Sequence, residues 1–117
     1  MAVYSTLPLS GSTNGRPIAI LSTASPGTTL HTVSTATAIR DHVYGWVWNQ
    51  ATTQSELTIE WGGTSTLDQM TLTIPARDGA YAVLPGAALI GATDIVVRAF
   101  ATATNRLFAF GHVDRAT

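Results

Sequence analysis

A two-residue alternation between residues 41 and 63 is the sequence feature that most constrains the fold. The stretch contains two runs, 43–48 and 56–61, in which large apolar residues recur at every second position. Successive side chains on a strand point to opposite faces, so this spacing predicts two β-strands joined by a polar loop. All three tryptophans of the chain lie in these two strands, and we expect the other strands to cover this pair.

The two strands differ in the character of their faces. In the second, Leu57, Ile59 and Trp61 share one face, while Glu56 and Glu60 share the other. One face in the core and one in water is therefore expected. The first strand is apolar on both faces, which indicates a central strand or a strand against a partner subunit.

The aromatic face of the first strand, formed by Tyr44, Trp46 and Trp48, admits two interpretations. The row could stack on sugar rings or on a partner, or it could fill the core between two sheets. We favour the core, because the chain offers few other large apolar residues.

The rest of the chain predicts further short strands separated by turns, without a helix. Including the first two, the expected strands are 17–22, 28–33, 43–48, 57–61, 70–74, 80–84, 94–102 and 106–113, with 34–40 a weaker strand or an extended link. The Pro85-Gly86 pair should end one strand, 87–92 should be an apolar loop, and the last two strands should form a hairpin. About eight short strands at regular spacing predict an all-β fold, a single antiparallel β-sandwich or jelly roll.

Two regions are expected along the chain. Residues 1–15 should form an extended N-terminal arm, and residues 16–117 the β-sandwich domain. The arm has apolar anchors in a Ser/Thr/Gly-rich stretch, which favours docking, on a neighbouring subunit for example. The anchors are Tyr4, Leu7, Pro8 and Leu9.

Composition narrows the classes of function. Charged residues make up only 11% of the chain, the net charge is -1, and the chain has no lysine and no cysteine. A near-zero charge argues against non-specific nucleic-acid binding, and the missing cysteines exclude disulfides and thiolate zinc sites. No apolar run is long enough to span a membrane, and the N-terminus has no conventional secretion signal. A neutral, hydroxyl-rich surface suits a protein that is largely covered by neighbours.

No set of residues predicts catalysis, a metal or a cofactor. His31, His42 and His112 fall on three different strands or strand edges, so we expect solvated or interface histidines and no zinc site. Glu56 and Glu60 would lie about 13 Å apart on one strand face, which is too far for a glycosidase pair and indicates a solvated face. The chain contains neither a G-x-S-x-G motif nor a phosphate-binding glycine loop, and we expect no enzymatic activity.

Two residues of the last strands are candidates for an interface between subunits. Arg98 interrupts an apolar strand, so it should either pair with an acid or lie at such an interface, where its planar fork makes directional hydrogen bonds. Phe110 is the second candidate.

Several phrases carry a resemblance to a known class of protein. They are PGTTLHTV, GWVWN, ELTIEWGGT, TLTIPARDG and IVVRAFATATNRLFAFGHVDR, spread over residues 26–115. This succession resembles small structural proteins encoded among the head genes of tailed bacteriophages. The resemblance implies a capsid cement or decoration protein, made in the host cytoplasm and bound to the major capsid protein on the outside of the virion. Such proteins are often trimeric and have no catalytic residues.

The expected contacts and the alternatives follow from this resemblance. Tyr4, Leu7 and Pro8 would contact the capsid or a neighbouring subunit, and Arg98 and Phe110 would lie between subunits. The first alternative is a receptor- or carbohydrate-binding module of a head or tail fibre, which would use the row of Tyr44, Trp46 and Trp48. The second is a small tail or connector component, which would form rings.

Overall fold

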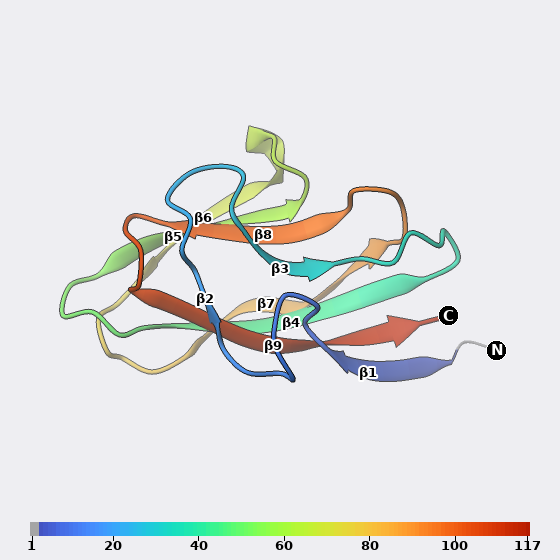
Figure 1. Ribbon diagram of the computed structural model, residues 1–117, viewed down its shortest axis with the longest axis horizontal. Coiled ribbons are helices and arrows are strands. Elements are labelled where there is room, and N and C mark those ends of the chain that lie inside the picture. Colours follow the sequence, from blue (N-terminus) through green and yellow to red (C-terminus); the bar gives the residue numbers. More distant parts are fainter. Residues whose placement is uncertain (1–2) are drawn as a thin grey trace.

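The computed structural model describes residues 3–117 and consists of two antiparallel sheets packed face to face (Figure 1). One sheet has five strands in the order β1-β9-β4-β7, with β2 also paired to β9, and the other has four in the order β3-β8-β5-β6. The elements are β1 (Tyr4–Pro8), β2 (Ile18–Ala19), β3 (Thr28–Thr32), β4 (Arg40–Asn49), β5 (Ser55–Gly62), the 3-10 turn η1 (Thr66–Asp68), β6 (Gln69–Ile74), β7 (Tyr81–Ile90), β8 (Val96–Ala101) and β9 (Leu107–Ala116). The predicted β-sandwich is confirmed, with nine strands in place of about eight.

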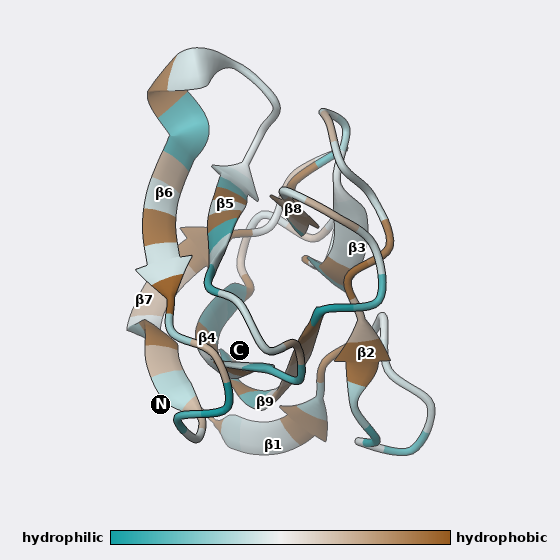
Figure 2. Ribbon diagram, turned by 90° about the vertical axis from the view of Figure 1, so that its left-hand side faces the viewer, coloured by the Kyte–Doolittle hydropathy of each residue, from teal (hydrophilic) through white to brown (hydrophobic). Residues whose placement is uncertain are grey.

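The core between the sheets is aliphatic. The four-stranded sheet contributes side chains such as Leu57 and Ile59, and the five-stranded sheet contributes Val43, Val47 and Val113, all at most 1% exposed. Figure 2 shows the resulting alternation of hydrophobic and more hydrophilic residues along strands such as β6. No Phe, Tyr or Trp side chain within 3–117 is fully buried. The favoured interpretation of the aromatic row as core was therefore wrong.

The inner face of β4 explains why the core excludes the aromatic row. At Gly45, an added Cβ would lie only 2.9 Å from Cδ1 of Leu84, so Leu84 of the neighbouring strand β7 occupies the space beside this glycine. The valines at 43 and 47 complete the same face. Compact side chains fill the roughly 10 Å between the sheets, and the larger rings take the outer face.

One predicted strand pairing was wrong. Strands β8 and β9, which were expected to form a hairpin, lie in different sheets. The two strands of the opening stretch, β4 and β5, also lie in different sheets. The chain from 102 to 106 crosses from one sheet to the other. Alternation identifies the two faces of a strand but not its partners, and a short connection can join strands within a sheet or between sheets.

Strand β7 continues through the pair expected to end it. Pro85 and Gly86 lie within β7, opposite a part of β4 where the register shifts twice, and Gly86 has a φ of 99°. Since β7 is an edge strand, the missing N–H of proline and a bulge are tolerated there. Residues 87–90, expected as a loop, form the second half of this strand, whereas 34–39 form no strand.

The N-terminal segment lies along its own sheet. Strand β1 pairs with the last five residues of β9, from Tyr4 opposite Ala116 to Pro8 opposite His112. Leu9 then enters the core at 1% exposure. Residues 1 and 2 of the predicted arm lie outside the described residues.

Candidate functional site

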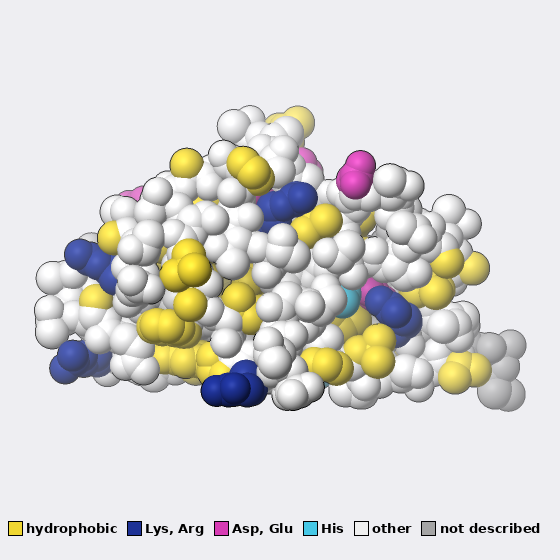
Figure 3. Space-filling model, viewed as in Figure 1, with side chains coloured by type: hydrophobic (Ala, Val, Ile, Leu, Met, Phe, Trp, Pro, Cys, Tyr) yellow, Lys and Arg dark blue, Asp and Glu magenta, His cyan; other side chains and the backbone are white. Residues whose placement is uncertain are grey.

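The two outer faces of the sandwich have different chemistry. On the four-stranded sheet the outward positions are mixed, with threonines such as the cross-strand pair Thr58 and Thr71, whose hydroxyls lie 3.2 Å apart, beside charged residues. On the five-stranded sheet the outward positions of the central strands β4 and β9 are mainly aromatic. Hydrophobic side chains gather along the lower half of the view in Figure 3, over β9, β2 and β1. This outer face is therefore the candidate functional site, since large exposed apolar patches are often places of interaction.

Six rings form what we call the aromatic ladder. They are Tyr44, Trp46 and Trp48 of β4 and Phe108, Phe110 and His112 of β9. Antiparallel register places the rings opposite one another in three pairs, 44 with 112, 46 with 110 and 48 with 108. The pairing therefore aligns two rows of alternating aromatics that lie 60 residues apart in the sequence.

The rings of the ladder interdigitate. Ring centroids are 4.8 Å apart for Tyr44 and His112, and 6.0 Å apart for His112 and Trp46. From Trp46 the series continues to Phe110 at 5.7 Å and on to Trp48 at 5.4 Å. Except for the last pair, which is tilted by 58°, these rings lie within 28° of parallel. Offset stacking of this kind is worth about 0.5–1.5 kcal/mol per pair beyond burial, so it stabilises this arrangement of the rings.

Small residues flank the ladder along β7. Ala82 lies opposite Trp46, and Ala88 lies opposite His42. At Gly86 a Cβ would come within 2.5 Å of Cζ of Tyr44, so the tyrosine ring lies directly over this glycine. Because the neighbouring side chains of β7 are small, the rings project beyond them as a ridge. The rings are half-buried, except that of Phe110, which is 38% exposed.

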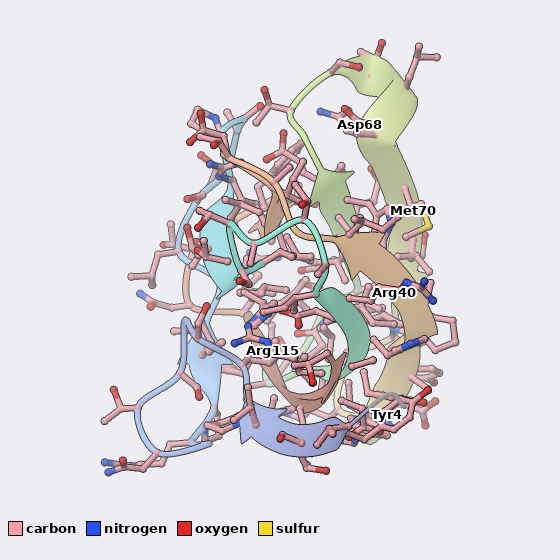
Figure 4. The ribbon with its side chains drawn as sticks, turned by 90° about the vertical axis from the view of Figure 1, so that its right-hand side faces the viewer. Tyr4, Arg40, Asp68, Met70 and Arg115 are labelled. Atoms are coloured by element: carbon pink, nitrogen blue, oxygen red, sulfur yellow. The ribbon has the colours of Figure 1, made fainter. Side chains whose placement is uncertain are left out.

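Hollows lie around this ridge and at the open edge of the sandwich. One, of 550 Å³, lies where Trp48 and Phe110 meet the turn between β6 and β7. A second, of 440 Å³, lies beside Phe108. An apolar hollow of 310 Å³ lies on the side of the molecule where Figure 4 labels Met70, between β6 and β7.

A buried polar cluster joins His31, Asp41 and Arg115. The Asp41 carboxylate is 0% exposed. It accepts hydrogen bonds from Nε of Arg115 at 2.7 Å and from Nη2 of Arg115 at 2.9 Å. It also lies 2.8 Å from Nε2 of His31, whose Nδ1 accepts the Ser10 N–H at 3.1 Å. The Ser10 contact assigns the ring hydrogen to Nε2, which therefore donates to Asp41. The expectation that this histidine is solvated or at an interface was wrong.

The cluster is structural in character. Burial by itself would raise the pKa of Asp41, but hydrogen bonds from Arg115 and His31 outweigh it and hold that pKa below its ordinary value. The same carboxylate raises the pKa of Arg115. Figure 4 shows Arg115 between the two layers. The cluster ties together β3, β4, β9 and the loop after β1, and both carboxylate oxygens of Asp41 and both ring nitrogens of His31 have protein partners.

The other candidates for chemistry are dispersed. His42 contacts the Gly86 carbonyl at 3.2 Å, and His112 is part of the ladder. Glu60 was expected on a solvated face, but its side chain is 0% exposed because the β2–β3 loop covers it. Its carboxyl group accepts hydrogen bonds from the Ser25 hydroxyl at 2.6 Å and from the Gly27 N–H at 2.7 Å. Among residues 3–117, no group of three or more His, Asp or Glu side chains could hold a metal ion.

The structure brings together residues predicted for two different functions. Phe110, proposed for a subunit interface, lies in the ladder with the three rings proposed to stack on a ligand, and Pro8 borders it opposite His112. Tyr4 is 66% exposed at the far end of β1, and Leu7 is half-buried. Alternation along 107–113 places Phe108, Phe110 and His112 on one face of their strand, but it does not place that face beside β4. The register that joins them is a tertiary property.

Arg98 lies apart from the ladder. It is on β8 of the other sheet, opposite Glu60 and Thr29. No carboxylate oxygen in the part of the chain described lies within 4.0 Å of its guanidinium. Its place at a subunit interface stays a prediction.

No protein-family model matches the chain, and no curated protein or solved structure shows a significant similarity to it. Within residues 3–117, no helix has the length and apolar character that crossing a membrane requires.

Proposed function

We propose that the protein is a non-catalytic structural component that attaches to a larger assembly through the aromatic ladder. The assembly is the head of a tailed bacteriophage, which the protein decorates on its outer surface by binding the major capsid protein. The observation that carries the proposal is the six-ring ladder on one outer face. Tryptophan and tyrosine are the residues that most often dominate binding energy at protein interfaces.

The geometry of the rings favours a protein partner over a sugar for the middle of the ladder. A sugar ring stacks on an open aromatic face. In the ladder, the faces of Trp46 are directed to Phe110 and His112, at centroid distances of 5.7 and 6.0 Å. The ridge therefore presents mainly ring edges, which fit between the side chains of a complementary protein surface.

The mechanism is associative. Each copy would bridge neighbouring capsid subunits, and a trimeric arrangement would multiply weak contacts through effective concentration. Tyr4, Leu7 and Pro8 of the β1 edge, and Arg98 and Phe110, remain the proposed additional contacts with the capsid or between subunits. A surface with few charges loses little hydration when neighbours cover it.

Replacing Trp46 with serine is expected to weaken capsid binding at least tenfold, since an interface residue of this kind contributes about 2 kcal/mol or more. Binding is measured by co-sedimentation with empty expanded capsids of the encoding phage, and the mass of the unbound pool gives the oligomeric state. Phe110→Ser, at a more exposed ring, is the second variant. Phe100→Ser is the matched control, because Phe100 is a half-buried aromatic on β8, opposite Thr58 on the other sheet.

Equal binding by Trp46→Ser, Phe110→Ser and the control would exclude the ladder as the contact. A wild-type protein that fails to sediment with capsids would overturn decoration and favour the fibre module. A ring-shaped oligomer in the unbound pool would instead favour the tail or connector component.

A further inference from the structure

The hollow at one end of the ladder combines an aromatic wall with a fixed guanidinium. It measures 550 Å³ and is lined by Trp48, Asn49, Gln50, Arg77, Gly79, Ala80 and Phe110. Gly79 and Ala80 have little or no side chain, so the space beside the rings of Trp48 and Phe110 stays open. The hollow is shallow and open to solvent, so a ligand would lie against its wall and stay partly exposed.

Arg77 is held in place by the end of β4. Its backbone N–H donates to the Asn49 carbonyl at 3.0 Å, and its Nε donates to the Gln50 carbonyl at 3.1 Å. Its φ of 49° is in the left-handed region, where the turn directs the side chain back over this end of the sheet. The Asn49 amide closes the arrangement by donating to the Ile74 carbonyl at 3.1 Å. The guanidinium is therefore oriented before any ligand arrives, with both Nη groups available.

The local charge is positive. Asp78, the acid next to Arg77, accepts the hydroxyl of Tyr81 instead of pairing with the guanidinium. Within residues 3–117, no carboxylate oxygen lies within 4.0 Å of Arg77. A second arginine, Arg106, lies at the same end, where its Nη1 donates to Thr53 and its carbonyl accepts the Gln50 N–H.

We propose that this hollow binds a carboxylated sugar, with its carboxylate on Arg77. The sugar ring would lie against the edges of Trp48 and Phe110, since the faces of Trp48 are directed to Phe108 and Phe110 at centroid distances of 5.9 and 5.4 Å. The C–H face of a pyranose is apolar and packs on aromatic side chains. The planar guanidinium binds a carboxylate through two parallel hydrogen bonds. The Gln50 side chain at the rim offers an amide for sugar hydroxyls. Phe110 belongs both to this hollow and to the proposed capsid contact, whereas Arg77 belongs to the hollow alone. The Arg77→Lys titration therefore tests the sugar site without testing capsid binding.

The test is an NMR titration of the full chain that follows the tryptophan indole N–H signals. The probe is a trisaccharide of galacturonic acid, and the neutral galactose trisaccharide is its uncharged match. With the acidic probe, the Trp48 signal should shift in a saturable manner, while the Trp61 signal, remote from the hollow, should stay in place. Arg77→Lys keeps the charge but cannot form the two-point contact, so it should weaken binding about tenfold.

The control variant is Arg106→Lys, which changes a cation at the same end outside the lining of the hollow and should leave the affinity unchanged. The proposal would be overturned if the Trp48 signal did not shift with up to about 20 mM probe, a concentration at which millimolar affinity would be evident, or if Arg77→Lys bound with unchanged affinity. Equal binding of the neutral trisaccharide would also overturn it. So would equal binding of a tri-glutamate peptide, which would indicate recognition of an acidic protein segment.

Discussion

Replacing Asp41 with asparagine is expected to lower the free energy of unfolding by about 3 kcal/mol. The carboxylate is fully buried and accepts hydrogen bonds from Arg115 and His31. An asparagine would present N–H groups to a cation and leave that cation without its counter-charge. The loss is at the lower end of the range for broken buried pairs, because Arg115 keeps 25% of its side-chain surface in water. Urea unfolding followed by circular dichroism measures the difference.

Asp114→Asn is the matched control for this change. Asp114 lies on the adjacent strand, is half-exposed, and accepts the Thr6 hydroxyl at 3.0 Å, which an asparagine oxygen can also do. We expect a change of at most about 0.5 kcal/mol. If the two variants lost equal stability, the buried cluster would not be the reason.

The same cluster predicts how stability depends on pH. Because the pKa of Asp41 is lower in the folded chain than in the unfolded chain, its contribution is fully present above the unfolded value. It is lost as the pH falls through the folded value. The difference in unfolding free energy between wild type and Asp41→Asn should therefore be constant near neutral pH and shrink below about pH 4. A difference that grew on acidification would contradict the assignment.

Replacing Glu60 with alanine is expected to cost about 2–3 kcal/mol of unfolding free energy. The carboxyl group is 0% exposed and receives the Ser25 hydroxyl and the Gly27 N–H, which anchor the β2–β3 loop on the outer face of β5. Removing it leaves two donors without an acceptor and a gap beneath the loop. Glu60→Gln retains one acceptor and should lose about half as much. The same urea titration provides the measurement.

Glu56→Ala is an informative control because Glu56 has the same side chain on the same face of the same strand, four residues earlier, but is exposed. Its loss should stay within about 0.5 kcal/mol. Equal losses in the two alanine variants would show that the loop contacts of Glu60 contribute nothing.

The alternation in the sequence predicted the faces of the strands well, but not which face is covered. For β4, period two correctly separated Val43 and Val47 from Trp46 and Trp48. Since both sets are apolar, the pattern could not decide which set enters the core. The choice depends on the space between the sheets, and there Leu84 from β7 already fills the position beside Gly45.

The same limit explains Glu60 and the ladder. The Glu/Thr face of β5 was expected in water, but a loop that begins more than 30 residues earlier covers one of its carboxyl groups. The ladder depends on β9 lying beside β4, whereas the sequence suggested that β8 and β9 pair with each other. In both cases the deciding contact joins segments far apart in the chain, which local patterns do not encode.

Two of the three tryptophans stack with other rings in the ladder, whereas Trp61 packs against the core. A partner that covers the ridge is therefore expected to change the near-ultraviolet circular dichroism of the protein. The ladder is thus a built-in chromophore that reports the occupancy of this face without any label.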